Sequence, residues 1–411
     1  MSKPRHIAVI GAGPAGMMAA IQAARGGCKV TVFEKQKKAG RKLAITGNGQ
    51  CNITNTGIEE SRYHGHNASF VRNVFARFGL DETVEFFYSI GIPLVEKKRG
   101  KLYPHSLQAQ SVSDILEYEM QKAGAELILH RRIDRIKQAG KGLVLESPGE
   151  AMNVDAVIIA CGSCAYPQLG ASHEVYELAR SIGHHVYEPF PAILPVNIPL
   201  KVLHRLEGIK WDCGVKALSA GKGVSSSEGE VLFTRYGLSG PATLEVSRAL
   251  NESLLAKKET RVALDLFPDR SIPETNELLE FLLADPDKKL GFALLGALKR
   301  RMPEIMLEIG GFDPEALCGS LDEKKRRALL NFLKNVMLAP GEPRAFSEAV
   351  VAAGGIDVNE VDPSTMQSKK MKGVYLAGEI LDIDGDSGGF NLQFAWSTGA
   401  IAGRSSLTPS S

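Results

Sequence analysis

Apolar residues at the two ends of the chain fall into short runs. These runs occupy residues 7–10, 30–33, 154–160 and 374–377, and only Thr31 and Asp155 interrupt them. Apolar runs of this length are typical of strands buried on both faces of a parallel sheet. Residues 17–25 lie between the first two runs, are rich in alanine and methionine, and contain no helix breaker, so we expect a helix there. The two ends of the chain therefore predict one α/β domain with a buried parallel sheet.

The middle of the chain follows a different pattern. Residues 195–266 alternate short strand-like runs with glycine and serine turns, which predicts a small β-barrel or sandwich. Apolar residues then recur at helical spacing through residues 273–335, and we interpret them as core packing. This helical group contains Leu278, Leu279, Phe281, Leu282, Phe292, Leu294, Leu295, Leu298, Leu329, Leu330, Phe332 and Leu333.

These patterns predict a chain of three parts. Its 411 residues are too many for one ordinary domain. We expect residues 1–190 and 366–411 to form the α/β domain. Residues 191–270 and 336–365 should form an inserted β-barrel-like domain, and residues 271–335 a helical subdomain carried by it.

A glycine pattern connects the first predicted strand to the first predicted helix. Gly11, Gly13 and Gly16 form G-x-G-x-x-G. The first glycine permits a sharp turn, the second lets a pyrophosphate approach the backbone, and the third lets helix and strand pack closely. The helix N-terminus adds free N–H groups and a partial positive charge. Glu34 ends the second strand, where its carboxylate can accept hydrogen bonds from a ribose diol. A glycine-rich loop alone is the weaker interpretation, and the full spacing predicts dinucleotide binding.

The segment after Glu34 is rich in glycine, asparagine and threonine and begins with several basic residues. Such a segment can surround a polyanionic cofactor with backbone N–H groups and short side chains. For residues 35–38 taken alone, a solvated basic loop is the simpler interpretation. Because the segment follows a dinucleotide pattern, we favour cofactor contacts by Arg41, Lys42, Gly49, Cys51 and Asn52.

Residues 40–55 have the sequence GRKLAITGNGQCNITN. This stretch resembles the motif G-R-K-x-x-x-[ST]-G-G-G-R-C-N-x-T-N of bacterial flavoproteins that include BaiN-like and aminoacetone-oxidase-like proteins. It departs from that motif at Asn48 and Gln50, and Gln50 removes a cation. Further similarity occurs around Tyr166, Pro167, Gly170 and Tyr176 and from residue 365 through Gly399, so the resemblance covers nearly the whole chain.

The resemblance implies a Rossmann-like FAD-binding domain of the glutathione-reductase type. It implies that the backbone near Ile133 meets the adenine and that residues 160–162 pass the cofactor. Near the C-terminus, strand, glycines and predicted helix repeat the opening pattern, and the helix start can stabilise negative charge on the pyrimidine side of a reduced flavin. The complete expected cofactor-binding set is Gly11, Gly13, Pro14, Ala15, Gly16, Glu34, Lys35, Arg41, Lys42, Gly49, Cys51, Asn52, Ile133, Ala160, Cys161, Gly162, Gly378, Glu379, Gly388, Gly389, Phe390, Asn391 and Leu392.

Composition narrows the class of protein. Hydrophobic residues make up 44% and charged residues 23%, and the net charge is +2, so we expect no general attraction to nucleic acid or membrane. The first predicted strand begins at residue 7, which leaves no room for a signal peptide, and the cysteine spacing does not suggest a secreted disulfide scaffold. We therefore expect a cytoplasmic protein, and the resemblance implies a bacterial enzyme. We expect no metal site, and the sequence leaves the oligomeric state open.

The expected reaction is two-electron (hydride) transfer between flavin N5 and a small organic substrate bound between the FAD domain and the insertion. The sequence has no second dinucleotide pattern after a strand, so electrons come either from the substrate or from NAD(P)H that docks directly. The resemblance does not choose, because that family includes both an amine oxidase and a proposed NAD(P)H-linked steroid reductase. A non-catalytic FAD-binding partner protein is the alternative of another class.

Cys161 and Cys164 are the only candidates for redox-active side chains. They form C-G-S-C at the end of a predicted strand that should pass the flavin. A helix start or a loop of amides there can lower a thiol pKa, and the pair could then relay electrons to a disulfide substrate. The competing interpretation is that both residues pack as small apolar side chains.

Overall fold

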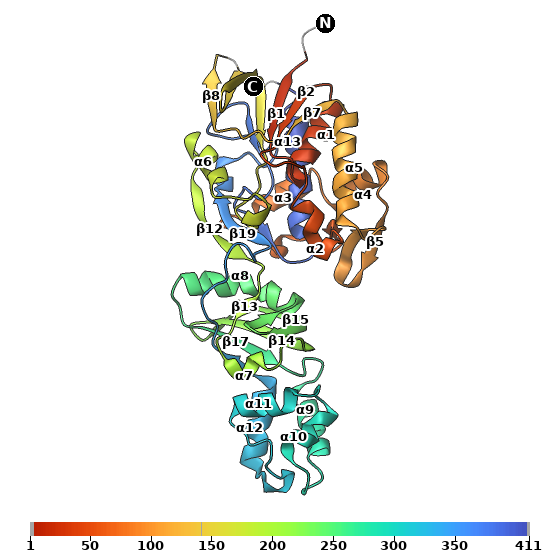
Figure 1. The fold of residues 1–411 in the computed structure, drawn as a ribbon, viewed down its shortest axis with the longest axis vertical. Helices are drawn as coiled ribbons and strands as arrows, with labels where there is room; N and C mark the ends of the chain where they lie inside the picture. The colour runs from red at the N-terminus through yellow and green to blue at the C-terminus, as the bar shows by residue number, and fades with distance from the viewer. Residues whose placement is uncertain (1–3, 141, 409–411) are drawn as a thin grey trace. The chain divides into compact units, whose positions relative to one another are not determined.

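The computed structural model describes residues 4–140 and 142–408, and these form two compact units (Figure 1). The first contains the described residues up to Phe190 and those from Val351 onward, and the second contains Pro191–Val350. The first unit resumes at residue 351 rather than at the expected residue 366, because strand β19 (Val351–Ile356) pairs with strand β12 (Val186–Ala192). Residues 351–365 therefore belong to the first unit and not to the predicted insertion.

The first unit is organised around a five-stranded sheet. Its strand order is β20-β11-β1-β2-β7, and all four neighbouring pairs are parallel. The central strands are buried along nearly their whole length, as the apolar runs predicted. The strands are β1 (His6–Ile10), β2 (Lys29–Phe33), β7 (Ala125–Ile128), β11 (Ala156–Ile159) and β20 (Val374–Leu376).

Three helices pack together beside this sheet: α1 (Pro14–Arg25), α5 (Ala109–Lys122) and α13 (Phe390–Ser405) (Figure 1). Helices α1 and α13 cross at very short range. A Cβ atom on Gly399 would lie 2.4 Å from the carbonyl oxygen of Ala15, and one on Gly403 would lie 2.5 Å from that of Ala19. The N-terminal and C-terminal helices are therefore locked together through glycine.

Smaller elements surround this core. Strands β8 (Arg135–Ala139), β9 (Gly142–Ser147) and β10 (Glu150–Val154) form an antiparallel sheet that contacts β1 and β11. Strands β3 (Thr54–Asn55), β5 (Leu94–Lys97) and β6 (Lys101–Pro104) form another, and β4 (Tyr63–His64) pairs with β21 (Asp384–Gly385). The remaining helices of this unit are α2 (Thr46–Gly49), α3 (Phe70–Phe75), α4 (Leu80–Ser89) and α6 (Glu174–Ser181).

The second unit contains a six-stranded antiparallel sheet of order β13-β16-β15-β14-β17-β18. It is an open sheet with β13 and β18 at its edges, so the expected barrel is wrong. The sequence pattern also missed α8 (Pro241–Leu255), which packs on this sheet where further strands were expected. The strands are β13 (Val196–Asn197), β14 (Lys210–Ser219), β15 (Lys222–Thr234), β16 (Gly237–Ser239), β17 (Thr260–Asp265) and β18 (Val336–Leu338).

The helices of the second unit share one hydrophobic core with its sheet. Leu279 and Leu282 are buried in it, whereas Phe281 is 77%, Phe292 67% and Leu295 43% exposed. The interpretation of these three residues as core residues is therefore wrong. At about 100° per residue, Phe281 points away from the face that carries Leu279 and Leu282. The helices are α7 (Lys201–His204), α9 (Ile272–Leu282), α10 (Leu290–Ala293), α11 (Met302–Gly310) and α12 (Glu323–Lys334).

Candidate functional site

The glycine loop between β1 and α1 is closed toward the protein and open on one side. Gly11 has φ +103°, and a Cβ atom on it would lie 2.4 Å from the carbonyl oxygen of Ala160. A Cβ atom on Gly16 would lie 1.9 Å from the carbonyl oxygen of Gly11. At Gly13, by contrast, a Cβ atom would meet nothing within 4 Å. The loop thus packs tightly through its outer glycines and leaves space at the middle one, beside the N-terminus of α1.

Glu34 lies against this loop. Its Oε2 accepts a hydrogen bond from the backbone N–H of Ala12 at 2.9 Å, and its Oε1 accepts one from that of Gln36 at 2.8 Å. A carboxylate has about four acceptor positions, so both oxygens keep capacity for further donors. The side chain is therefore fixed beside the glycine loop with acceptor positions to spare, which suits the ribose contact predicted for it.

The basic residues of the next segment are tied to distant parts of the first unit. Lys42 Nζ forms an ion pair with Glu379 at 2.7 and 3.0 Å. Arg41 donates to Gln36 Oε1 and to the carbonyl oxygen of Leu169, and Lys35 donates to Ser172 Oγ at 3.1 Å. The Lys42–Glu379 pair brings two expected cofactor segments together, although they are separated by more than 300 residues. Direct cofactor contacts by these cations stay a prediction.

The tight turn at residues 47–51 leads into a buried amide. Gly47, Asn48, Gly49 and Cys51 all have left-handed backbone conformations. Asn52, which follows, is only 8% exposed, and its Oδ1 is buried with no hydrogen-bond partner among the described residues. Buried polar atoms without a partner are rare and costly, so this acceptor indicates a donor supplied by a bound group.

Asn52 lies at the start of α13. A Cβ atom on Gly389, the N-cap of this helix, would lie 2.5 Å from the carbonyl oxygen of Thr54 and 3.0 Å from Asn52 Oδ1. No side chain among the described residues caps the helix, and Asn55 Nδ2 holds the carbonyl oxygen of Gly388 at 2.9 Å. The flavin pyrimidine ring carries an N–H donor between two carbonyl acceptors. An unpartnered acceptor beside uncapped helix N–H groups fits that edge, so the residues present fit FAD.

The helix start is further fixed by its own residues. The Asn391 side chain accepts from the N–H of Gly385 at 2.8 Å and donates to its carbonyl oxygen at 2.7 Å. Tyr63 Oη donates to the carbonyl oxygen of Phe390 at 3.1 Å. Leu392 follows within the first turn of α13. These contacts hold the uncapped N–H groups in place.

The remaining expected cofactor-binding residues are residues 160–162, at the end of β11, and Ile133, which was expected near the adenine. The N–H of Ala160 donates to the carbonyl oxygen of Ile10 at 2.8 Å, which sets residues 160–162 beside the glycine loop. A Cβ atom on Gly162 would meet nothing within 4 Å. Ile133 is buried, and its backbone contact with adenine stays a prediction.

Cys161 and Cys164 do not have the properties of reactive thiols. Both are free. Burial raises the pKa of Cys161 to about 12, with a further contribution from the Glu34 carboxylate, and raises the pKa of Cys164 to about 11. The expected lowering of a thiol pKa is therefore wrong. The physical reason is loss of solvation, because Cys164 is buried and Cys161 is partly buried, with its Sγ 3.5 Å from the carbonyl oxygen of Ile10.

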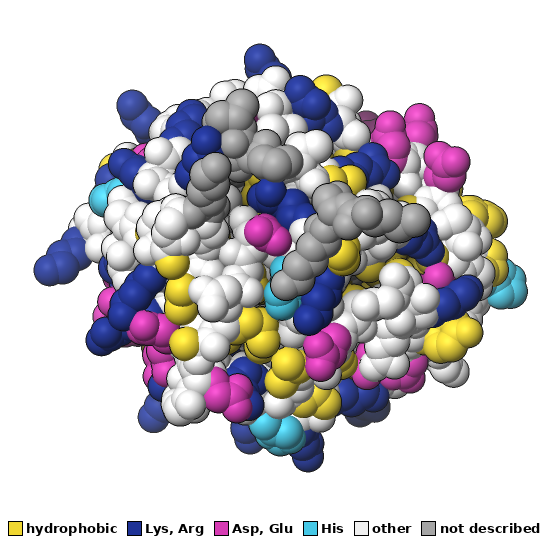
Figure 2. Space-filling model, turned by 90° about the horizontal axis from the view of Figure 1, so that it is seen from above, with side chains coloured by type: hydrophobic (Ala, Val, Ile, Leu, Met, Phe, Trp, Pro, Cys, Tyr) yellow, Lys and Arg dark blue, Asp and Glu magenta, His cyan; other side chains and the backbone are white. Residues whose placement is uncertain are grey.

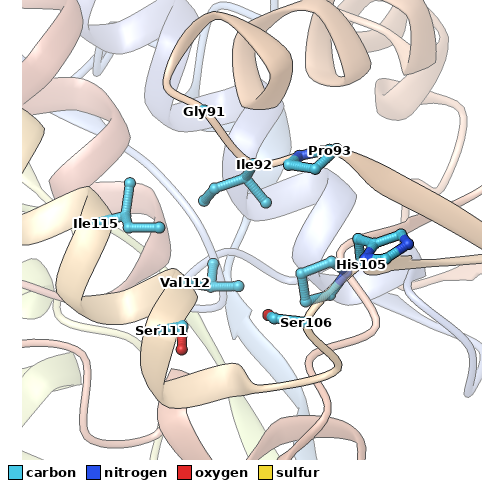
Figure 3. Close-up of a pocket in the computed structure, with 9 residues that line it drawn as sticks. Gly91, Ile92, Pro93, His105, Ser106, Ser111, Val112 and Ile115 are labelled. Atoms are coloured by element: carbon cyan, nitrogen blue, oxygen red, sulfur yellow. The ribbon is translucent and has the colours of Figure 1, made fainter.

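A small cavity in the first unit lies apart from these residues. It has a volume of about 280 Å³ and lies between the β5–β6 hairpin and α5 (Figure 3). None of the expected cofactor-binding residues lines it, and its lining is largely apolar. The lining consists of Gly91, Ile92, Pro93, Pro104, His105, Ser106, Ser111, Val112 and Ile115.

The charge pattern gives no sign of a strong single-sign field. Figure 2 shows Lys and Arg side chains interspersed with Asp and Glu side chains on the face that it presents. Residues 191–350 contain as many basic as acidic residues. No helix among the described residues combines the length and the apolar character needed to cross a membrane.

The family profile of the HI0933-like protein Rossmann domain matches residues 5–405 of this chain. A 3-dehydro-bile acid delta(4,6)-reductase from Clostridium scindens is 34% identical over 402 residues, covering 97% of this chain and 98% of the relative. A ribosomal RNA dihydrouridine synthase from Haemophilus influenzae is 30% identical over 404 residues, covering 97% of each.

Among solved structures, the 3-ketosteroid delta1-dehydrogenase of Sterolibacterium denitrificans aligns with a TM-score of 0.53. The alignment covers 98% of this chain and 99% of that chain at 13% identity, so it concerns the fold.

Proposed function

Because this chain belongs to the HI0933-like family of FAD-dependent oxidoreductases, which confirms the predicted BaiN-like family, we propose that it reduces a carbon–carbon double bond conjugated with a carbonyl group. The bond belongs to a small organic molecule, and the hydride comes from flavin N5. FAD supplies the two-electron chemistry when bound, and the protein supplies binding, orientation and electrostatics.

The observation that supports the cofactor role best is the geometry around Asn52. Its buried Oδ1 lacks a partner while the start of α13 beside it lacks a side-chain cap. A single ligand edge with a hydrogen-bond donor and acceptors would satisfy both the Oδ1 of Asn52 and the free N–H groups of the helix start. At the other end of the site, the space at Gly13 and the carboxylate of Glu34 suit a pyrophosphate and a ribose. The whole cofactor then lies in the first unit.

The names of the relatives support the substrate class. The name of the Clostridium scindens relative describes a reductase that acts on a 3-dehydro bile acid at positions 4 and 6. The name of the Haemophilus influenzae relative describes the formation of dihydrouridine in ribosomal RNA. In chemical terms, a 4,6-diene next to a 3-keto group and the C5–C6 bond of uracil are both double bonds conjugated with a carbonyl. Addition of two hydrogens across such a bond is the reaction that the two names share. An unsaturated carbonyl compound is therefore the substrate class that we propose for this chain.

The balanced charges favour a small molecule over RNA. A protein that holds a nucleic acid neutralises phosphates with clustered Lys and Arg. The near-neutral chain and the interspersed charges in Figure 2 do not provide such a cluster on that face.

NAD(P)H that docks directly is the proposed electron donor, because the sequence carries one dinucleotide pattern only.

Anaerobic half-reactions followed by flavin absorbance test this proposal. The oxidised protein is mixed with NADH, NADPH or a set of amines, and bleaching of the flavin identifies the donor. The reduced protein is then mixed with conjugated enones, matched saturated ketones, or oxygen. We expect NADH or NADPH to reduce it and enones to re-oxidise it faster than saturated ketones. Rapid reduction by an amine, with re-oxidation by oxygen alone, would establish an oxidase instead.

A further inference from the structure

Tyr166 lies where three cofactor segments meet. Lys42 Nζ is 5.9 Å from the centroid of its ring, and the same Nζ forms the ion pair with Glu379. Glu379 follows Gly378, on which a Cβ atom would lie 2.8 Å from Cβ of Ala15 in the first turn of α1. Lys42 of the basic segment thus connects the tyrosine ring with the C-terminal loop, and that loop packs on the glycine-loop helix.

The backbone of Tyr166 is strained. Its φ and ψ are 63° and 60°, a left-handed conformation that costs a bulky residue about 1–2 kcal/mol. Residues held in such conformations concentrate at functional sites, because the surroundings must impose them. No local pattern in the sequence signals this strain, since tyrosine next to Pro167 is ordinary in a turn.

The surrounding turn imposes the conformation. The N–H of Leu169 donates to the carbonyl oxygen of Tyr166 at 2.9 Å, and the carbonyl oxygen of Leu169 accepts from Arg41 at 3.2 Å. A Cβ atom on Gly170 would lie 2.2 Å from Nε2 of Gln36, so the turn packs directly on the segment after Glu34. The backbone of Tyr166 is therefore held by this turn and by the segment on which the turn packs.

The electrostatics suit a phenol that gives up a proton during a reaction. The side chain is partly buried, and burial raises the pKa of Tyr166, so the phenol is protonated at neutral pH. The ammonium group of Lys42, which is paired with Glu379, lies over the phenol ring at 5.9 Å from its centroid. A neutral phenol beside the expected cofactor segments can serve as a general acid.

We propose that Tyr166 is the catalytic acid that delivers the proton during reduction of the conjugated double bond. This inference rests on the proposed function. Reduction of such a bond needs a hydride at the β-carbon and a proton at the α-carbon. Reduced FAD held by the first unit would supply the hydride and its two electrons to the β-carbon, and the electron pair of the double bond would move to the α-carbon and carbonyl oxygen. The O–H bond of Tyr166 would then break as its proton forms the new C–H bond at the α-carbon, and a proton taken up from solvent would restore the phenol.

The first test needs no substrate. A phenol against an excited isoalloxazine quenches its fluorescence by electron transfer, whereas a phenyl ring does not. We expect Tyr166→Phe to lengthen the fluorescence lifetime of the bound oxidised flavin. Tyr88→Phe is the matched control, because Tyr88 is 54% exposed on α4 and should leave the lifetime unchanged. An unchanged lifetime in flavin-loaded Tyr166→Phe would show that the phenol is not at the flavin, and would overturn the assignment.

The second test separates the half-reactions. Wild type and variants are reduced by dithionite and mixed anaerobically with 1,4-androstadiene-3,17-dione, a conjugated ketone. We expect Tyr166→Phe to slow re-oxidation by about 100-fold or more, while reduction by NAD(P)H changes little. Tyr166→His keeps a proton donor in a residue that tolerates the left-handed region, so it should recover part of the rate that Tyr166→Asn loses.

The outcomes distinguish two failures. Equal re-oxidation rates for wild type and Tyr166→Phe would overturn the role of Tyr166 alone. A wild-type protein that neither the dienone nor the other conjugated enones re-oxidise would overturn the proposed function, and the assignment of the acid with it.

Discussion

Replacement of Gly13 by alanine should weaken FAD binding while it leaves the free energy of unfolding of the apoprotein nearly unchanged. The backbone of Gly13 has φ −83° and ψ −173°, which alanine adopts without strain, and the new Cβ meets no protein atom within 4 Å. Alanine lowers the entropy of the unfolded chain, which stabilises the fold by about 0.4–1 kcal/mol. Alanine is also a poorer N-cap than glycine, which costs a similar amount. We therefore expect the free energy of unfolding of the apoprotein to change by less than about 1 kcal/mol.

FAD binding should respond much more strongly. The space beside Gly13 is where the pyrophosphate has to approach, and a methyl group there forces the ligand or the loop to move. Forcing an extra methyl group into a packed site costs about 1–3 kcal/mol, which corresponds to a loss of affinity of about 5- to 150-fold.

Titration of apoprotein with FAD, followed by flavin fluorescence, measures the affinity, and calorimetric unfolding of the apoprotein measures the stability. Gly223→Ala is the matched control, since a Cβ atom there also meets nothing within 4 Å but lies in β15 of the second unit. Gly16→Ala is the opposite case, because its Cβ would lie 1.9 Å from a carbonyl oxygen and should destabilise the apoprotein itself. Unchanged FAD affinity in Gly13→Ala would refute the phosphate position.

Three further predictions concern the same unit. Glu34→Ala removes the acceptor predicted for the ribose diol, so FAD should be lost on dilution with a penalty of roughly 1.5–3 kcal/mol, and full retention would contradict the assignment. Gly399→Ala places a Cβ atom 2.4 Å from the carbonyl oxygen of Ala15, so calorimetry should show lower stability by about 1–3 kcal/mol, and an unchanged midpoint would mean that α1 and α13 separate freely. The double variant Cys161→Ser/Cys164→Ser should take up as many electrons per flavin as oxidised wild type in an anaerobic dithionite titration, because both thiols have raised pKa values; two extra electrons in wild type would restore the redox pair.

Local patterns in the sequence predicted the parts of the site that depend on neighbouring residues. The strand, the glycine loop and the helix around Gly13 are specified by residues close in sequence, as is the position of Glu34. The same is true of the helix that begins after Gly389. Each of these predictions depends on backbone conformation and on burial of a continuous apolar run.

Contacts between distant segments were beyond such patterns. Lys42 and Glu379 form an ion pair although more than 300 residues separate them in the sequence. A lysine or a glutamate by itself does not indicate which residue it will pair with. Gly399 was expected only as part of a motif, although its importance lies in the close approach of α13 to α1. In the second unit, α8 was missed because its residues follow a strand-rich stretch, and the packing of that helix on the sheet is a tertiary effect.

The most direct test of the proposed reaction is the product of a single turnover. Protein reduced to one flavin equivalent is mixed without oxygen with the conjugated enone that re-oxidises it fastest, and the organic product is analysed by mass spectrometry. We predict a product heavier by two hydrogens, in an amount equal to the flavin that is re-oxidised. An unchanged enone beside flavin that only oxygen re-oxidises would contradict the proposed reaction.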